Sequence, residues 1–430
     1  MINTIFILFL ILYFIYQGSF SILKTCLFLI LAIIPLINIK KFNFLPLSND
    51  LSNIIFIWMS YFLLSFIITI INGFPIPNFK IFFNTFLLIP LSFTTAQLIS
   101  HKFSLLNIYK ILVSITLLTL FLNFALFFVD FYGLRYTSIF NLIFTTNSFG
   151  ALVNIESGIR FRSNNVVALI YLIPLNLHIL FYSYRLLSTK FQNIIKVNIL
   201  LGIILVFISG RRAFQYASFL SFLSLIFPIL VTKLNLRYIS IKKIKKLFKP
   251  NIFNILIFSV FIFIFIRVFN ILTESISIND LFNRVTLTLL APFNSSFEGT
   301  FVRLDQYSIL INGWLESPLF GHGLTSFPVL YFRHKTGVPS YEAVLHAMLY
   351  QVGLIGTIIY FAFIYYCLFG RNFPSLKAIT HQKPRHAIPF ATFWFIIASL
   401  SNPFGNNVVI WVLMIYYNIN REKNKNLNEL

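Results

Sequence analysis

The segment that decides the fold class is LLGIILVFISGRRAFQYASFLSFLSLIFPILV, residues 200–231. Two almost wholly apolar runs, Val197–Ile208 and Ala213–Val231, flank the adjacent Arg211 and Arg212. A helix that crosses a membrane needs about 20 mainly apolar residues, so the segment predicts a membrane hairpin whose turn carries two permanent charges. A charge at the bilayer centre costs about 2.5–3.5 kcal/mol, which places the pair at the membrane surface or in a wet cavity.

The whole chain has the composition of a membrane protein. Of its 430 residues, 58% are hydrophobic, 10% are charged and 55 are Phe, whereas soluble domains carry about 25% charged residues. About twelve segments are apolar enough to span a bilayer. They are 3–16, 20–39, 51–72, 81–99, 108–129, 164–182, 196–209, 213–231, 251–272, 344–369, 387–401 and 406–419. The first has no basic start and no small-residue cleavage site, so we expect a retained span.

The sequence therefore predicts an all-α polytopic membrane protein with about twelve transmembrane helices. The expected division is helices 1 to 9 in 1–272, an outside loop in 273–343, helices 10 to 12 in 344–419, and a cytosolic tail in 420–430. Within the loop, 277–290 and 300–317 have the mixed spacing of amphipathic helices. The segment SPLFGHGLTSFP, 317–328, predicts a turn, because one proline and two glycines interrupt any helix.

The net charge of +22 could indicate nucleic-acid binding, but the distribution of the charges argues against it. With a cytosolic N-terminus, 21 of the 33 Lys and Arg residues fall inside and 12 fall outside. This bias follows the positive-inside rule. We therefore expect no nucleic-acid partner, and we expect the lysine cluster in 239–250 to contact anionic lipid of the bilayer.

The type of basic residue differs between the two sides. Sixteen of the 21 inside residues are Lys, whereas nine of the 12 outside residues are Arg. Arginine holds phosphate oxygens two at a time and does not lose its proton, so the outside arginines predict an anion-binding surface. They are Arg135, Arg160, Arg162, Arg211, Arg212, Arg267, Arg284, Arg303 and Arg333.

The arginine pair in the hairpin strengthens this interpretation. Arg212 opens the following predicted helix, where a cation is unfavourable because free helical amides attract anions. An anion bound there would resolve the conflict. The alternative is that the two side chains reach for water and define the turn.

The loop and the next span contain two candidate histidines. His346 enters its span from the outside in LHAMLYQVGLIG, 345–356, and Gly353 and Gly356 predict close packing of another helix. His322 stands between Gly321 and Gly323, which permit close backbone approach. A histidine at a membrane interface is either a base or a satisfied polar group, and the sequence leaves both open.

Taken in order, these parts resemble the O-antigen polymerase and O-antigen ligase superfamily of bacterial polysaccharide enzymes. The resemblance covers roughly residues 205–360: an Arg-bearing hairpin, a large outside loop with Arg303, W…SPLFGHGLTSF, and LHAMLYQVGLIG. That family has a P-L-x-G-x-G turn and a late His followed by two glycines three apart. Many ligases have His-Asn at the last motif, whereas this chain has His346-Ala347, which favours a polymerase. The resemblance implies a C-type glycosyltransferase-like fold.

The resemblance also implies an activity. Such a glycosyltransferase joins repeat units carried on undecaprenyl pyrophosphate into O-antigen or capsular polysaccharide at the periplasmic face of the bacterial plasma (inner) membrane. It would be inverting, would need no cofactor and no metal, and would work with a chain-length regulator protein. The alternatives are a ligase that transfers the glycan to lipid A-core or protein, and, of another class, a polysaccharide flippase or transporter.

The resemblance assigns roles to individual residues. Arg211 or Arg212, together with Arg303, would hold the pyrophosphate, and His346 would be the base or orienting partner of the acceptor hydroxyl. Independently of the resemblance, the charge and the predicted side of three arginines in the outside loop 130–163 indicate a second pyrophosphate site, since a polymerase holds two lipid-linked substrates: Arg135, Arg160 and Arg162. Further candidate substrate-binding residues are Gly321, His322 and Gly323 of the turn.

Overall fold

The computed structural model describes thirteen stretches of the chain. These are residues 2–15, 21–37, 49–74, 88–131, 152–154, 160–162, 166–183, 186–209, 214, 217–224, 298–328, 344–369 and 387–399. The labelled elements are α1 (Ile2–Ile15), α2 (Ser21–Ile37), α4 (Asn49–Ile71), α6 (Leu88–Lys102), α7 (Leu105–Phe131), β1 (Leu152–Asn154), β2 (Arg160–Arg162), α10 (Val166–Tyr182), α11 (Thr189–Ser209), α16 (Glu298–Glu316), α17 (Val344–Phe369) and α19 (Ala387–Ser399).

The helices coincide with the predicted spans wherever the structure describes them. Three stretches are long and apolar enough to cross a membrane within the described residues: Asn53–Ile71, Leu105–Phe128 and Leu345–Leu368. Shorter apolar helices include α1, α2, α10 and α19. The chain is therefore an α-helical membrane protein. The predicted spans 251–272 and 406–419 lie outside the described residues, so the number of twelve spans and the periplasmic loop stay predictions.

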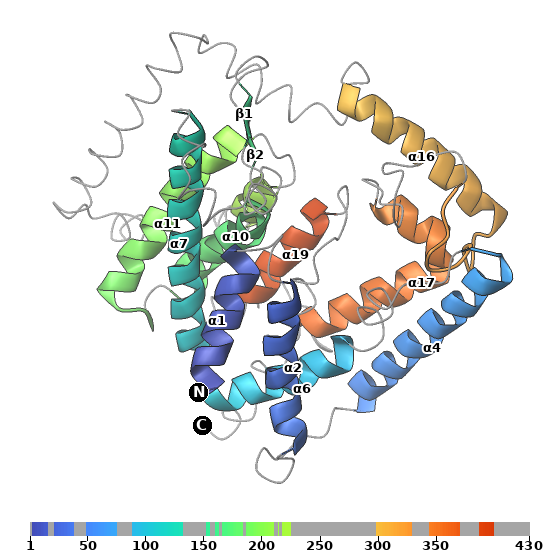
Figure 1. Ribbon diagram of the computed structural model, residues 1–430, viewed down its shortest axis with the longest axis horizontal. Coiled ribbons are helices and arrows are strands. Elements are labelled where there is room, and N and C mark those ends of the chain that lie inside the picture. Colours follow the sequence, from blue (N-terminus) through green and yellow to red (C-terminus); the bar gives the residue numbers. More distant parts are fainter. Residues whose placement is uncertain are drawn as a thin grey trace, which may run out of the picture.

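One short pair of β-strands departs from the all-α prediction. β1 and β2 pair antiparallel, with Leu152 opposite Arg162 and Asn154 opposite Arg160. Each strand has three residues, which is too short to show a period-2 pattern in the sequence. The pair packs beside α7 and α11 (Figure 1).

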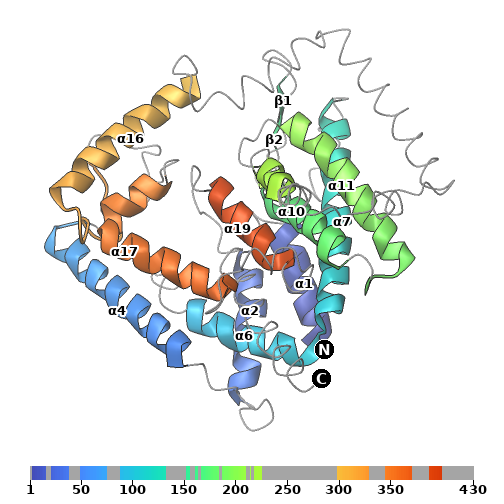
Figure 2. The same ribbon diagram turned by 180° about the vertical axis from the view of Figure 1, so that it is seen from behind.

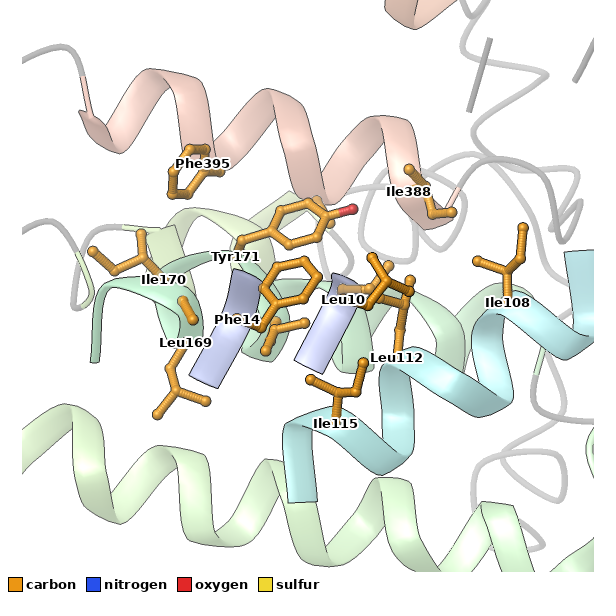
Figure 3. Packing of buried hydrophobic residues seen from close by; sticks show 14 of the residues in the cluster. Leu10, Phe14, Ile108, Leu112, Ile115, Leu169, Ile170, Tyr171, Ile388 and Phe395 are labelled. Atoms are coloured by element: carbon orange, nitrogen blue, oxygen red, sulfur yellow. The ribbon is translucent and has the colours of Figure 1, made fainter. Parts of the chain in front are cut away.

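The core of the main bundle lies where α1, α7, α10 and α19 meet (Figure 3). The rings of Phe14 and Tyr171 are stacked with centroids 6.3 Å apart. The other side of Tyr171 meets Phe395 edge-on at 6.0 Å. Aromatic pairs of this kind contribute about 0.5–1.5 kcal/mol beyond the burial of their area. They hold α10 between α1 and α19.

Buried polar side chains join α7, α10 and α11. Asn176 on α10 donates to Thr116 Oγ1 on α7 (2.9 Å), and Asn198 on α11 donates to Asn176 Oδ1 (3.0 Å) and to the Val113 carbonyl (2.9 Å). In an apolar surrounding such groups are costly unless they are paired. These bonds therefore fix the relative position of α7, α10 and α11.

A second polar contact holds the helical segment 217–224, which follows the arginine pair in the chain. Ser221 Oγ lies 2.9 Å from His178 Nε2 on α10. Trp394 on α19 donates its indole N–H to Ser224 Oγ at 2.9 Å. The segment is thus attached to both α10 and α19.

α2 packs against α1 and α6, and α4, α16 and α17 form a frame beside the bundle (Figures 1 and 2). Trp58 on α4 packs against Phe363 and Tyr360 on the second half of α17, with ring centroids 4.8 and 5.3 Å apart. The outer face of α4 exposes Phe56 (72%) and Ile71 (75%). An apolar face of this kind suits lipid and would be a liability in water.

Candidate functional site

α16 and the first half of α17 lie side by side. The rings of Tyr307 and His346 are 4.5 Å apart at an angle of 32°. Leu310, Ala347 and Tyr350 form a buried cluster next to this pair. We call the contact formed by Tyr307, Leu310, Gly313, His346, Ala347 and Tyr350 the α16–α17 seam. α16 coincides with the helix predicted for 300–317.

Arg303 stands at the start of this seam in the helical register. It precedes Tyr307 by four residues, so both positions lie on one face of α16, about 6 Å apart along its axis. The ring of Tyr307 in turn contacts His346. Two of the predicted catalytic residues, taken from separate stretches of sequence, therefore occupy adjacent turns of two packed helices.

α16 ends in the predicted turn, whose residues 317–323 we call the glycine turn. Gly321 and Gly323 have positive φ angles of 69° and 111°, a region that favours glycine. The indole of Trp314 donates to the Pro318 carbonyl at 2.8 Å, and the Ser317 hydroxyl donates to the Gly321 carbonyl at 3.0 Å. These bonds fold the chain back tightly at the end of α16.

α17 is broken at Gly353, where φ is 65° and ψ is −173°. In an unbroken helix the next N–H groups would donate to carbonyls four residues earlier. Here the Leu354 N–H donates to the Pro318 carbonyl at 2.9 Å, and the Ile355 N–H donates to the Leu319 carbonyl at 3.2 Å. Both acceptors belong to the glycine turn. Figures 1 and 2 show the two halves of α17 meeting in a sharp bend.

The carbonyls on the other side of the break are paired by the same turn. The Tyr350 carbonyl accepts the His322 N–H at 2.9 Å, and the Gln351 carbonyl accepts the Gly323 N–H at 2.8 Å. The glycine turn thus replaces both helical donors and both helical acceptors. A break inside an apolar helix is tolerated where other groups pair the freed backbone atoms in this way.

The approach of the two segments requires glycine on both sides. A Cβ added to Gly321 would lie 2.5 Å from the Gly353 nitrogen, and one added to Gly353 would lie 2.6 Å from the Gly321 nitrogen. Backbone atoms cannot move aside as a flexible side chain does. The two glycines therefore interlock, main chain against main chain.

α4 is the third partner of the interlock. The Tyr61 hydroxyl donates to the Val352 carbonyl at 2.6 Å, and the Asn72 amide donates to the His322 carbonyl at 3.0 Å. The Leu324 N–H points to the Ser65 carbonyl at 3.4 Å. The bend in α17, the glycine turn and the end of α4 consequently form one unit.

The imidazole of His322 is part of this unit. Its Nε2 lies 2.7 Å from the Gly313 carbonyl of α16, and its ring is stacked on Tyr350 of α17 with centroids 4.6 Å apart. The side chain is half-buried. His322 therefore joins α16 to α17, and substrate binding by this residue stays a prediction.

The other predicted residues lie elsewhere in the molecule or outside its described part. Arg135, Arg211 and Arg212 lie outside the described residues; α11 ends at Ser209, just before the arginine pair. Arg160 and Arg162 belong to β2, which contacts α11. Their binding of a second pyrophosphate stays a prediction.

The function of Gly353 in the fold differs from the sequence prediction. We predicted that Gly353 and Gly356 both admit a neighbouring helix. Gly356 does so, since a Cβ there would meet the Tyr61 ring of α4. Gly353 instead breaks the helix and meets the glycine turn. The contacts of Tyr61 on α4 and of Asn72, the residue after α4, were missed, although polar groups within an apolar span indicate a buried partner.

At the seam, the imidazole of His346 contacts the phenol ring of Tyr307, and the backbone position of Arg303 lies one turn before Tyr307. Such groups can deprotonate or orient a hydroxyl beside a bound anion. Within the described ranges no three His, Cys, Asp or Glu side chains gather as metal ligands. No protein-family model matches this chain, and no curated protein matches it significantly.

The interlock predicts that Gly353→Ala destabilises the protein more than Gly73→Ala. Gly73 also has a positive φ, 72°, but no atom lies within 4 Å of an added Cβ. Backbone strain alone should therefore lower the stability of that variant, by about 1–2 kcal/mol. Gly353→Ala adds the collision with the Leu319 carbonyl. Thermal unfolding of both variants in detergent measures the difference. Equal melting temperatures would show that the glycine turn does not enter the break.

Proposed function

We propose that this protein is a polysaccharide polymerase that uses lipid-linked substrates. It transfers a growing glycan from one undecaprenyl pyrophosphate to the next lipid-linked repeat unit at the outer face of the bacterial plasma membrane. The reaction needs no metal, and direct displacement inverts the anomeric centre. The family resemblance suggests this chemistry, and a chain-length regulator is the expected partner.

The observation that carries the proposal is the arrangement of Arg303, Tyr307 and His346. The resemblance places Arg303 at the pyrophosphate and His346 at the acceptor hydroxyl. For one bond to be made between the two substrates, both residues must serve the same centre. The backbone position of Arg303, one helical turn before Tyr307, and the 4.5 Å contact between the rings of Tyr307 and His346 support a shared centre.

The charge of the leaving group explains the arginines. When the glycosyl–oxygen bond breaks, the electron pair leaves with the lipid pyrophosphate, and its negative charge grows. Guanidinium groups aimed at that charge stabilise the transition state, and each can hold two oxygens at once. The outside loops contain no D-x-D pair for a divalent ion, so Arg303 with Arg211 or Arg212 takes this function.

Two rival functions make different demands on the molecule. A ligase uses the same chemistry but another acceptor, lipid A-core or a protein. A flippase or transporter requires ionisable groups near the middle of several spans. In the described part of the chain, His178 is such a group, and it bonds Ser221 between α10 and the segment 217–224, which gives it a packing function.

Reconstitution tests the proposed function directly. Purified protein in lipid vesicles, supplied with a lipid-linked repeat unit and a chelator, should lengthen the glycan. Movement of the substrate across the bilayer without lengthening would identify a carrier, and a strict metal requirement would contradict neutralisation by arginine. In cells, loss of a polymerase leaves single repeat units on the acceptor, whereas loss of a ligase leaves none.

Arg303→Lys should reduce the lengthening rate about 100-fold, although the charge is kept. The loss of one donor to a developing oxyanion costs a factor of this size, and lysine lacks the rigid fork. Arg333→Lys is the matched control, because it makes the same change in the same loop at an unassigned position. Full activity of Arg303→Lys would remove this residue from the pyrophosphate site.

His346→Ala should reduce turnover about 100-fold or more, the usual contribution of a general base, while the amount of protein in the membrane is unchanged. His334→Ala, which removes another imidazole of the outside loop, serves as the control. Glycan chain length on gels and turnover in vesicles are the measurements. A normal chain length would place the base at another residue.

A further inference from the structure

The hydrogen bond between His322 and Gly313 determines which ring nitrogen carries the proton. A carbonyl oxygen can only accept a hydrogen bond. The Nε2 of His322, 2.7 Å from the Gly313 carbonyl, is therefore the N–H donor. In the neutral ring the lone pair is then on Nδ1.

The ring that carries this lone pair is held in one orientation. It is stacked on Tyr350 at 4.6 Å, and the backbone of His322 is fixed by its bonds to the Tyr350 carbonyl and the Asn72 amide. No residue in the described part of the chain bonds Nδ1, and the side chain is half-buried. Nδ1 is thus an acceptor that is open to a donor other than the described residues.

Distance along the two helices decides what this acceptor can serve. Gly313, which His322 bonds, follows Tyr307 by six residues, which is about 9 Å along a helix. Tyr350, on which His322 is stacked, follows His346 by four residues, which is about 6 Å along a helix. His322 therefore lies one to two helical turns beyond the contact between Tyr307 and His346, on the side away from Arg303.

We propose that His322 Nδ1 accepts a hydrogen bond from a sugar hydroxyl that is at least one residue away from the reacting bond. The half-buried side chains of Tyr307, His346 and His322 beside the seam would then contact an oligosaccharide, with the reaction near Tyr307 and His346 and a distal subsite at His322. This inference rests on the proposed function. The donor glycan and the acceptor repeat unit both carry such hydroxyls, so the experiment shortens each of them separately.

The test is kinetic and uses His322→Gln in the vesicle assay. A glutamine places an amide N–H near the position of Nε2, so it keeps the bond to Gly313, but it has no acceptor at the Nδ1 position. The KM for the full-length donor or acceptor should rise about tenfold, the effect of one lost hydrogen bond, while kcat stays within about threefold. The substrate that is responsible shows no change in KM once it is shortened to its first sugar.

Two further variants separate binding from folding. Asn72→Ala removes one of the bonds that fix the His322 backbone but keeps the imidazole and its bond to Gly313, so it should lower the melting temperature and raise KM less than His322→Gln does. His322→Asn keeps a polar group near Nδ1 but loses the bond to Gly313, so it should lower the melting temperature more than His322→Gln.

Each remaining outcome overturns a defined statement. An unchanged KM in His322→Gln, with active wild-type protein, excludes the distal subsite and leaves the proposed function intact. A large fall in kcat at unchanged KM excludes a subsite and makes His322 the base. Wild-type protein that fails to lengthen any glycan overturns the proposed function, and the subsite with it.

Discussion

The pairing of the glycine turn with the break in α17 is the constraint on which the frame formed by α4, α16 and α17 depends. Two main-chain hydrogen bonds of an unbroken helix are missing at the break, and the four groups that would make them bond residues 318–323 instead. The hydrocarbon layer contains no water that could hydrogen-bond these groups, so the break can exist only together with the turn. It directs one half of α17 along α16 and the other half toward α4 and α19.

The break also explains how helices of very different character share one site. α16 is a loop helix with many polar residues, and α17 is an apolar span. A straight α17 would lead away from α16 along its whole length. Because the chain bends at Gly353, its first half lies against α16, and His346 and Tyr350 face Tyr307 and Gly313. Backbone geometry thereby places the side chains that the proposed chemistry uses.

Much of this could be predicted from the sequence, for a simple physical reason. An apolar run of about 20 residues has few structures available in a bilayer, so the helices were predictable from composition. The spacing in 300–317 predicted α16, and proline with two glycines predicted the glycine turn. These signals are local, and each is complete within a few residues.

The interlock could not be predicted, because its signals are distant in sequence. Gly353 in an apolar helix is compatible with close helix packing and with a break, and the choice depends on a turn some thirty residues earlier. Asn72 and His322, which bond each other, are 250 residues apart. The strands β1 and β2 could not be predicted for another reason, because a strand of three residues shows no periodic pattern.

The interlock has a consequence for the order of assembly during synthesis. The glycine turn leaves the ribosome before Gly353 does, so its carbonyl and amide groups have no partner in α17 until that helix is made. In its bent form α17 has unpaired main-chain groups until it meets the turn, and hydrocarbon offers them no other partner. The frame formed by α4, α16 and α17 is therefore completed late in biogenesis, after α17 has been synthesised.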